Sequence, residues 1–197
     1  MWPPFDNPHF PRHLICNLEV VVPRPKLLTP KVGARDHVRG SPDAPVTLVQ
    51  YADFECPFCG RAFPEIKSVL KDLGAQVRFV FRHFPMVEQH PHAETAAELA
   101  EAAAGQGKFW EMHDLLFQRQ SALEDERLIA YARELGLDVP RVERELQEHV
   151  HRARVRQDFQ SGVRSGVSGT PMFFINGRRH EEPGDAETLR AALLRSL

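Results

Sequence analysis

Two cysteines three positions apart, Cys56 and Cys59, carry the clearest chemistry in this 197-residue sequence. They enclose Pro57 and Phe58 in the run C-P-F-C, between a β-branched segment and a helical pattern. Sulfurs at positions i and i+3 of such a turn can reach bonding distance. The free N–H groups at a helix start favour a thiolate on Cys56, the form that attacks disulfides. Cys59, one turn further on, is expected to be more buried and to resolve the mixed disulfide.

A metal site and an inert buried pair are the alternatives for these two cysteines. One C-x-x-C supplies two ligands, whereas zinc usually has four, and Cys16 is far away in sequence. His90 and His92 are two positions apart and would not share a helix face. We therefore expect no metal, and no cofactor other than a redox-active Cys56–Cys59 disulfide, with Cys16 as a bystander thiol.

The segments around the motif predict a strand, a helix and a second strand. Residues 46–52 are rich in β-branched side chains and predict a buried strand. Apolar residues then recur at helical spacing up to Gly74, with Pro57 in the first turn and Pro64 inside the helix, where it should cause a kink. Residues 76–84 alternate and predict the second strand.

The next 75 or so residues show helical patterns only. Four helices are expected, the first opened by Pro91, the next two over 108–117 and 126–135, and the last opened by Pro140. In the first of them the alanines fall on one face. The opposite face carries Glu94, Glu98 and Glu101.

The last part of the sequence predicts a hairpin and a helix. Residues 171–176 form a strand, Asn176-Gly177 is a strong hairpin turn, and residues 178–180 return. A final helix follows Gly184. The order strand–helix–strand, helical insert, strand–strand–helix indicates a mixed α/β sheet with an inserted helical subdomain.

Composition and the N-terminus limit the remaining classes of function. The net charge is -2 and no basic cluster is interleaved with aromatics, so we expect no nucleic-acid partner. No apolar run approaches the roughly 20 residues that span a bilayer. Residues 1–35 contain seven prolines and one possible edge strand, Leu18 to Val22. They are expected to pack on the domain as an arm, with a swapped arm in a dimer as the alternative.

The N-terminus also lacks the layout of a secretory signal, because its first eleven residues contain no lysine or arginine and many prolines. A cytoplasmic protein is therefore expected, with export as the alternative if the true start differs.

Four motifs together resemble the DsbA-like family of thioredoxin-fold proteins. They are D-F-E-C-P-F-C-G (53–60), F-R-H-F-P-M (81–86), Q-G-K-F-W-E-M-H-D-L-L-F (106–117) and S-G-T-P-M-F-F-I-N-G (168–177). The resemblance runs from about Arg35 to the C-terminus. It implies an α/β thioredoxin-like fold with an inserted all-helical subdomain. The expected division is an extension over 1–35 and a domain over 36–197, with the insert at about 88–163.

The resemblance also assigns roles around the cysteines. Cys56 looks like the attacking thiol and Cys59 like the resolving one. Thr170-Pro171 is similar to the family's cis peptide pair, which would place the Thr170 backbone beside Cys56, where a substrate strand can pair with it. Pro57 and Phe58 would help to set the redox poise.

Two further positions are candidates for support of the thiols. Relatives commonly carry a buried Asp or Glu six residues before the first cysteine, and here that position is Gln50, which cannot relay a proton as a carboxylate does. The alternative is that Gln50 simply fills its site. His83, after the second strand, is a possible neighbour of the Cys56 thiolate, although such a histidine more often supports a loop.

The implied activity is oxidation, reduction or isomerisation of protein disulfides. Its partners would be protein or peptide thiols and a redox partner such as a reductase, glutathione or an oxidase. A glutathione-dependent transferase or isomerase acting on small molecules is the first rival, and a metal-binding or partner-docking module is the second. The direction of electron flow stays open, and a monomer and a homodimer are both compatible with the sequence.

Overall fold

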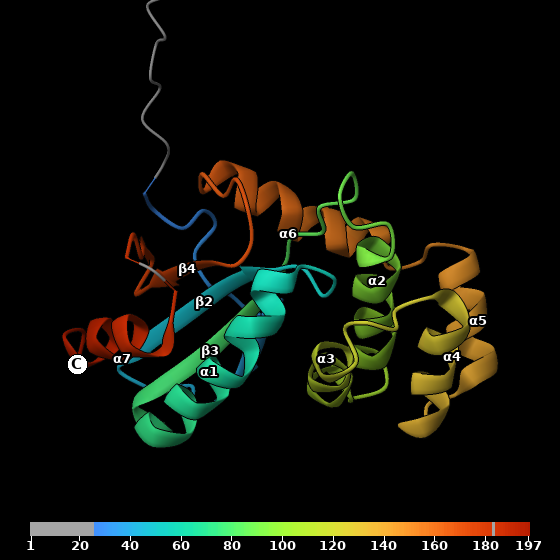
Figure 1. The fold of residues 1–197 in the computed structure, drawn as a ribbon, viewed down its shortest axis with the longest axis horizontal. Coiled ribbons are helices and arrows are strands. Elements are labelled where there is room, and N and C mark those ends of the chain that lie inside the picture. Colours follow the sequence, from blue (N-terminus) through green and yellow to red (C-terminus); the bar gives the residue numbers. More distant parts are fainter. Residues whose placement is uncertain (1–25, 183) are drawn as a thin grey trace, which may run out of the picture.

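The protein, described by a computed structural model over residues 26–182 and 184–197, is built on a five-stranded sheet. The strands run in the order β1-β3-β2-β4-β5 (Figure 1). They are β1 His37–Arg39, β2 Val46–Ala52, β3 Val77–His83, β4 Met172–Ile175 and β5 Arg178–Arg179. Cys16 and the edge strand expected at Leu18 to Val22 lie outside the described residues.

Strand β2 lies at the centre of the sheet, and every one of its side chains is buried. It runs parallel to β3, and helix α1 (Pro57–Leu73) with the short 3-10 helix Gly74–Gln76 makes the crossover between them. It pairs antiparallel with β4, so that Tyr51 near its end lies opposite Met172 at the start of β4. This register brings the cysteine turn after β2 next to the chain that enters β4.

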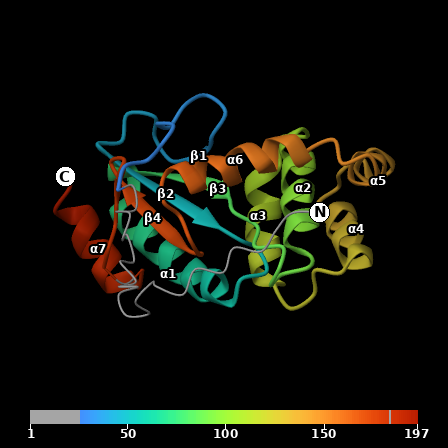
Figure 2. The same ribbon diagram turned by 90° about the horizontal axis from the view of Figure 1, so that it is seen from above.

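Helices cover both faces of the sheet. Figure 2 shows α1 and α7 (Ala186–Leu194) on one face and α6 (Arg152–Arg164) on the other. Successive side chains of β2 point to opposite faces. Leu48 and Ala52 belong to the apolar cluster that includes α1, whereas Val49 and Tyr51 belong to the cluster on the opposite face.

The helical insert departs from the sequence expectation at two places. Its helices are α2 Ala93–Ala104, α3 Phe109–Gln118, α4 Asp125–Glu134, α5 Val139–Gln147 and α6. The single helix expected from Pro140 through Ala153 is wrong, because the chain breaks at His149 (φ 52°) and α6 starts afresh at Arg152. The His149 ring contacts Glu98 (Nδ1···Oε1 2.9 Å), which holds this break against α2.

The glutamate face of α2 is the second departure. Glu98 and Glu101 are buried together with the alanines, because α3, α5 and α6 pack around α2. The amphipathic pattern therefore predicts the helix correctly, but it does not predict that the face carrying Glu98 and Glu101 is buried. Each buried glutamate has histidine partners, as a buried charge requires.

The described part of the N-terminal extension packs on its own domain. Leu28 donates its backbone N–H to Gly177 O (2.8 Å), and Thr29 N–H bonds to Ser165 Oγ (2.8 Å). The buried guanidinium of Arg82 holds the same segment through Asp36 (Nε–Oδ1 2.7 Å). Among the described helices, none has the length and apolarity needed to cross a membrane.

Candidate active site

The cysteine turn joins the end of β2 to the start of α1. Cys56 is the N-cap residue of α1 and Pro57 its first residue, as the sequence predicts. The Cys56 N–H bonds back to Asp53 O (3.3 Å), which closes the turn. Both thiols are free and buried, Cys56 with 4% of its surface exposed and Cys59 with none. The turn therefore presents one thiol close to the surface and keeps the other inside.

The two thiols differ in acidity because of their hydrogen bonds and their burial. The pKa of Cys56 is lowered to about 5, mainly by a hydrogen bond from Cys59, against the opposing effect of burial. Hydrogen bonds from Thr170 and from the backbone of Cys59 and Phe58 lower it further. Burial, and then the hydrogen bond and charge of Cys56, raise the pKa of Cys59. At neutral pH Cys56 is a thiolate and Cys59 a thiol, which is the division of labour of a nucleophile and a resolving group.

The chain entering β4 forms the opposite side of the site. The Thr170–Pro171 peptide bond is cis, as the resemblance implies. The Thr170 carbonyl oxygen lies 3.4 Å from Cys56 Sγ. The Thr170 hydroxyl donates a hydrogen bond to Met86 Sδ (3.8 Å). The structure thus brings Thr170 and Pro171 to the nucleophile, whereas their role in binding a substrate stays a prediction.

Asp53 is a site residue that the sequence analysis did not identify. Its carboxylate is almost fully buried and accepts three hydrogen bonds, from Glu55 N (2.8 Å), Met86 N (2.8 Å) and His90 Nδ1 (2.7 Å). Nearby, Glu55 Oε2 accepts the His92 N–H (2.7 Å). Residues 86–92 are therefore fastened to the cysteine turn by two carboxylates. No local sequence pattern predicts this contact, because Asp53 and His90 are 37 positions apart.

Two histidines stand in different relations to the thiolate. His83 is fully buried and its Nε2 bonds to Glu101 Oε1 (2.9 Å), so its expected role beside Cys56 stays a prediction. His90, in contrast, interacts electrostatically with the negative charge of Cys56. Burial opposes its protonation, but the hydrogen bond with Asp53 and the charges of Asp53, Cys56 and Glu55 raise the pKa of His90.

Replacing His90 by glutamine should raise the pKa of Cys56 above its value of about 5. His90 is still protonated when Cys56 titrates, and because a close opposite charge lowers the pKa of an acid by roughly 1–3 units, we expect a rise of about one unit. Thiolate absorbance at 240 nm against pH in the reduced protein measures this. His92→Gln is the matched control, because its ring makes no described bond at the turn. An unchanged Cys56 titration in His90→Gln would contradict the assignment.

Gln120 from the insert holds the cysteine turn from the other side. Its Nε2 donates to Phe54 O and to Cys56 O, both at 2.8 Å. Gly60 makes room for it, since a Cβ at Gly60 would lie 2.1 Å from Gln120 Oε1. The glycine after the second cysteine is therefore explained by a contact between α1 and the insert.

The effect of Gly60→Ala on the free energy of unfolding should have opposite signs in the wild type and in Gln120→Ala. In the wild type the new methyl displaces the Gln120 amide, and two hydrogen bonds worth about 0.5–1.5 kcal/mol each are lost. In Gln120→Ala those bonds are already absent, so alanine in place of a helical glycine should stabilise by roughly 0.5–1 kcal/mol. Urea unfolding of the four proteins measures both steps. Equal effects of Gly60→Ala in both backgrounds would show that the glycine does not serve Gln120.

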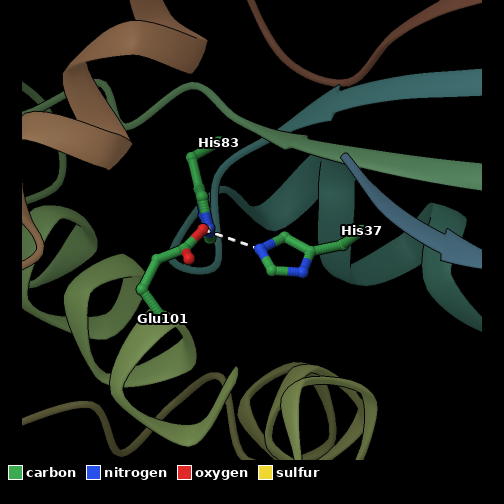
Figure 3. A group of neighbouring side chains, drawn as sticks. All are labelled: His37, His83 and Glu101. Atoms are coloured by element: carbon green, nitrogen blue, oxygen red, sulfur yellow. Dashed lines mark hydrogen bonds and ion pairs between the residues drawn. The ribbon is translucent and has the colours of Figure 1, made fainter. Parts of the chain in front are cut away.

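A buried cluster beside the site connects the sheet to the insert. His37 from β1 and His83 from β3 both bond to Oε1 of Glu101 on α2, at 2.8 and 2.9 Å (Figure 3). These three ligand atoms lie within 4.8 Å of one another, a spacing that would suit a metal ion. However, Arg154 Nε lies 3.7 Å from the same oxygen, and its permanent charge would oppose a cation there. The contacts fit a structural link better than a metal centre.

Two apolar side chains are exposed on the segments that form the site. Phe58 has 63% of its surface exposed, and the Arg61 guanidinium lies 4.4 Å from its ring centroid. Val87, on the segment fastened by Asp53, is also exposed. Gln50 is buried on the α1 side of the sheet, and its expected proton-relay position stays a prediction.

Comparisons with known proteins agree with this geometry. A family model described as Thioredoxin matches residues 33–194. A thioredoxin-like oxidoreductase from Silicibacter pomeroyi superposes with a TM-score of 0.74 at 28% identity, covering 83% of this chain and 93% of that one. The thiol-disulfide exchange protein alpha-DsbA2 from Wolbachia pipientis superposes with a TM-score of 0.69 at 19% identity, covering 81% of this chain and 86% of that one.

A curated relative contains a similar sequence within a longer protein. The Na(+)/H(+) antiporter NhaA 3 of Salinispora tropica is 50% identical over 85% of this chain, but over only 26% of its own length. The chain thus spans about a quarter of the curated relatives it matches. The family match and the helices inserted into the sheet lead to one assignment. The chain belongs to the thioredoxin family, and it shares its fold with a DsbA-type structure.

Proposed function

We propose that this protein exchanges disulfides with protein or peptide substrates, with Cys56 as the attacking thiol and Cys59 as the resolving thiol. The observation that carries the proposal is the split in acidity within one buried pair: the pKa of Cys56 is about 5, whereas that of Cys59 is raised. A metal pair or two inert core cysteines would not need this difference. The nearby cis Thr170–Pro171 bond supports the same conclusion.

The chemistry follows in two balanced steps. The Cys56 thiolate attacks one sulfur of a substrate disulfide, and the other sulfur leaves as a thiolate that takes up a proton. Cys59 then loses its proton and attacks Cys56 Sγ, releasing the second substrate thiol. Two electrons pass to the substrate, and the Cys56–Cys59 disulfide forms. Run in reverse, the same steps oxidise a substrate dithiol.

The exposed groups around Cys56 favour an extended peptide as substrate. Phe58 offers an apolar contact beside the nucleophile, and the backbone at Thr170 lies within reach of the same sulfur. A peptide strand pairing with that backbone would align its own sulfur with Cys56. The redox partner that resets the pair, of reductase, glutathione or oxidase type, is part of the proposal.

The acidity of Cys56 also limits the reduction potential. Thioredoxin has a nucleophile pKa near 7 and DsbA near 3.5, and a more stable thiolate makes the disulfide more oxidising. A Cys56 pKa of about 5 therefore places this pair between roughly -270 and -120 mV. In a cytoplasmic location, which we retain as a proposal, a glutathione pool at about -220 to -260 mV would keep a pair in the upper part of this range reduced and favour reductase or isomerase work.

Equilibration with glutathione buffers tests the proposal. The protein is incubated at a series of potentials, quenched in acid and alkylated, and its free thiols are counted by mass spectrometry. We expect Cys56 and Cys59 to switch together between two thiols and one disulfide inside that bracket. A pair that stays reduced under every oxidising buffer would contradict the proposal.

A further inference from the structure

The resolving thiol needs a base, and none of its immediate neighbours on the sheet is one. Cys59 is fully buried, and it must lose a proton before it can attack a mixed disulfide. The polar side chain on the same face of β2 is Gln50, since its strand neighbours Leu48 and Ala52 share a cluster with Cys59. An amide does not accept a proton at neutral pH. The proton acceptor is therefore solvent or a group on another element.

A small cavity connects Gln50 with a base on the insert. The cavity has a volume of about 10 Å³, room for one water molecule, and Gln50 and His113 line it together with apolar side chains and with Arg39 and Lys67. Phe63 and Ile66 of α1 also line it, and they lie four and seven residues after Cys59, on the same helix face. The cavity therefore begins about one helical turn beyond Cys59, which does not itself line it.

His113 is the neutral base in this lining. Its Nδ1 contacts Asp114 Oδ1 (2.8 Å), so Nδ1 carries the proton and Nε2 keeps a lone pair. Nε2 is buried and has no hydrogen-bond partner among the described residues. Burial lowers the pKa of His113 to about 4, against the hydrogen bond and charge of Asp114. The unpartnered Nε2 is thus an available acceptor atom, and the low pKa makes His113 a weak base in the resting protein.

Asp114 links His113 to the surface. Lys67 Nζ bonds to Asp114 Oδ2 (2.9 Å), and Arg39 Nη2 lies 3.3 Å from Oδ1. The charged and titratable groups that face His113 are thus Asp114 on its own helix, Lys67 on α1, Arg39 on β1 and His83 on β3. A proton accepted at Nε2 would be balanced by the Asp114 carboxylate at Nδ1.

We propose that His113 accepts the proton released by Cys59 when it resolves a mixed disulfide, through a water molecule held beside Gln50. The inference rests on the proposed function. The proton moves from Cys59 Sγ through water to His113 Nε2, Cys59 Sγ bonds to Cys56 Sγ, and the substrate sulfur leaves and is protonated. His113 is a positioning residue, because it acts through water rather than on the sulfurs themselves.

The energetics of this transfer differ from those of the two isolated groups. In the mixed disulfide Cys56 carries no charge, so one cause of the raised Cys59 pKa disappears. A thiolate and an imidazolium then form together in one buried region, and each stabilises the other. His113 has no need to be a strong base in the resting protein.

Single-turnover reduction of 5,5′-dithiobis(2-nitrobenzoate) tests this step. Attack by Cys56 releases one nitrothiobenzoate, and resolution by Cys59 releases the second, both followed at 412 nm. We expect His113→Phe and His113→Gln to leave the first release unchanged and to slow the second by about 100-fold. The wild-type second phase should be flat between pH 6 and 8, whereas in the variants it should rise about tenfold per pH unit as hydroxide takes over.

Gln50→Glu separates a relay from a packing role. In the His113→Phe background it places a carboxylate in the same cavity and should restore the second phase. Met112→Leu, a volume-conserving change beside His113, is the control and should alter neither phase. A wild-type second phase in both His113 variants, or a slow phase that Gln50→Glu does not rescue, would overturn the relay. Absence of the first release in the wild type would overturn the proposed function itself.

Discussion

Cys59→Ser should stop turnover on protein disulfides and leave the protein trapped on its substrate through Cys56. Serine fills the buried position but its hydroxyl cannot attack a disulfide, so the second step fails while the first is retained. Cys56 keeps its site at the start of α1 and its contact with Thr170 O (3.4 Å). The expected loss in steady-state turnover is on the order of 10³-fold or more, as when one member of a catalytic unit is removed.

The trapped species is the readout that identifies the mechanism. A cysteine-containing peptide disulfide should accumulate as an adduct of Cys59→Ser, detected by its mass and released by dithiothreitol. Cys56→Ser is the matched control and should form no adduct, because the buried Cys59 with its raised pKa is a poor nucleophile. Both variants change one sulfur to oxygen within the same turn.

The same variant separates the leading function from its main rival. A glutathione-dependent transferase or isomerase supplies its thiol from glutathione and does not require a resolving cysteine. Such an enzyme would retain its activity on small molecules in Cys59→Ser. Retained turnover without an adduct would therefore reject the dithiol mechanism and favour the glutathione-dependent one.

The site is predictable from sequence where the signal is local. The strand before Cys56, the proline after it and the glycine that ends α1 are adjacent signals that act within one turn of chain, and all three appear where expected. The Asn176–Gly177 turn is of the same kind, because both residues have the positive φ angles that a tight hairpin needs.

What the sequence does not show depends on contacts between distant segments. Strand β1 is three residues long with no pattern of its own, and it exists because it pairs with β3. Three features form only when the insert is folded against the sheet. They are the Asp53–His90 pair, the hydrogen bonds of Gln120 to the cysteine turn and the unpartnered nitrogen of His113. Helical periodicity places a residue on a face but does not say what that face meets.

Glu101→Gln should destabilise the protein strongly although it lies outside the cysteine turn. Glu101 Oε1 accepts hydrogen bonds from His37 and His83 and lies near Arg154, so it joins β1, β3 and α6 to α2. Glutamine has the same shape, but it loses the charge that faces these groups. Removing one member of a buried charged cluster costs about 3–5 kcal/mol. Urea unfolding at pH 7 measures this, with the exposed Glu111→Gln on α3 as the matched control.

The pH dependence of this effect has a definite sign. Burial opposes the ionised carboxylate, but the hydrogen bonds and charges of His37 and His83 outweigh it and hold the pKa of Glu101 well below its ordinary range. A depressed carboxyl pKa contributes stability that is fully present above the unfolded value of about 4.3 and is lost as pH falls toward the folded value. The difference between wild type and Glu101→Gln should therefore be constant from pH 5 to 7 and shrink below about pH 4. A difference that grows on acidification would show that the histidines, rather than the carboxylate, control the stability of this cluster.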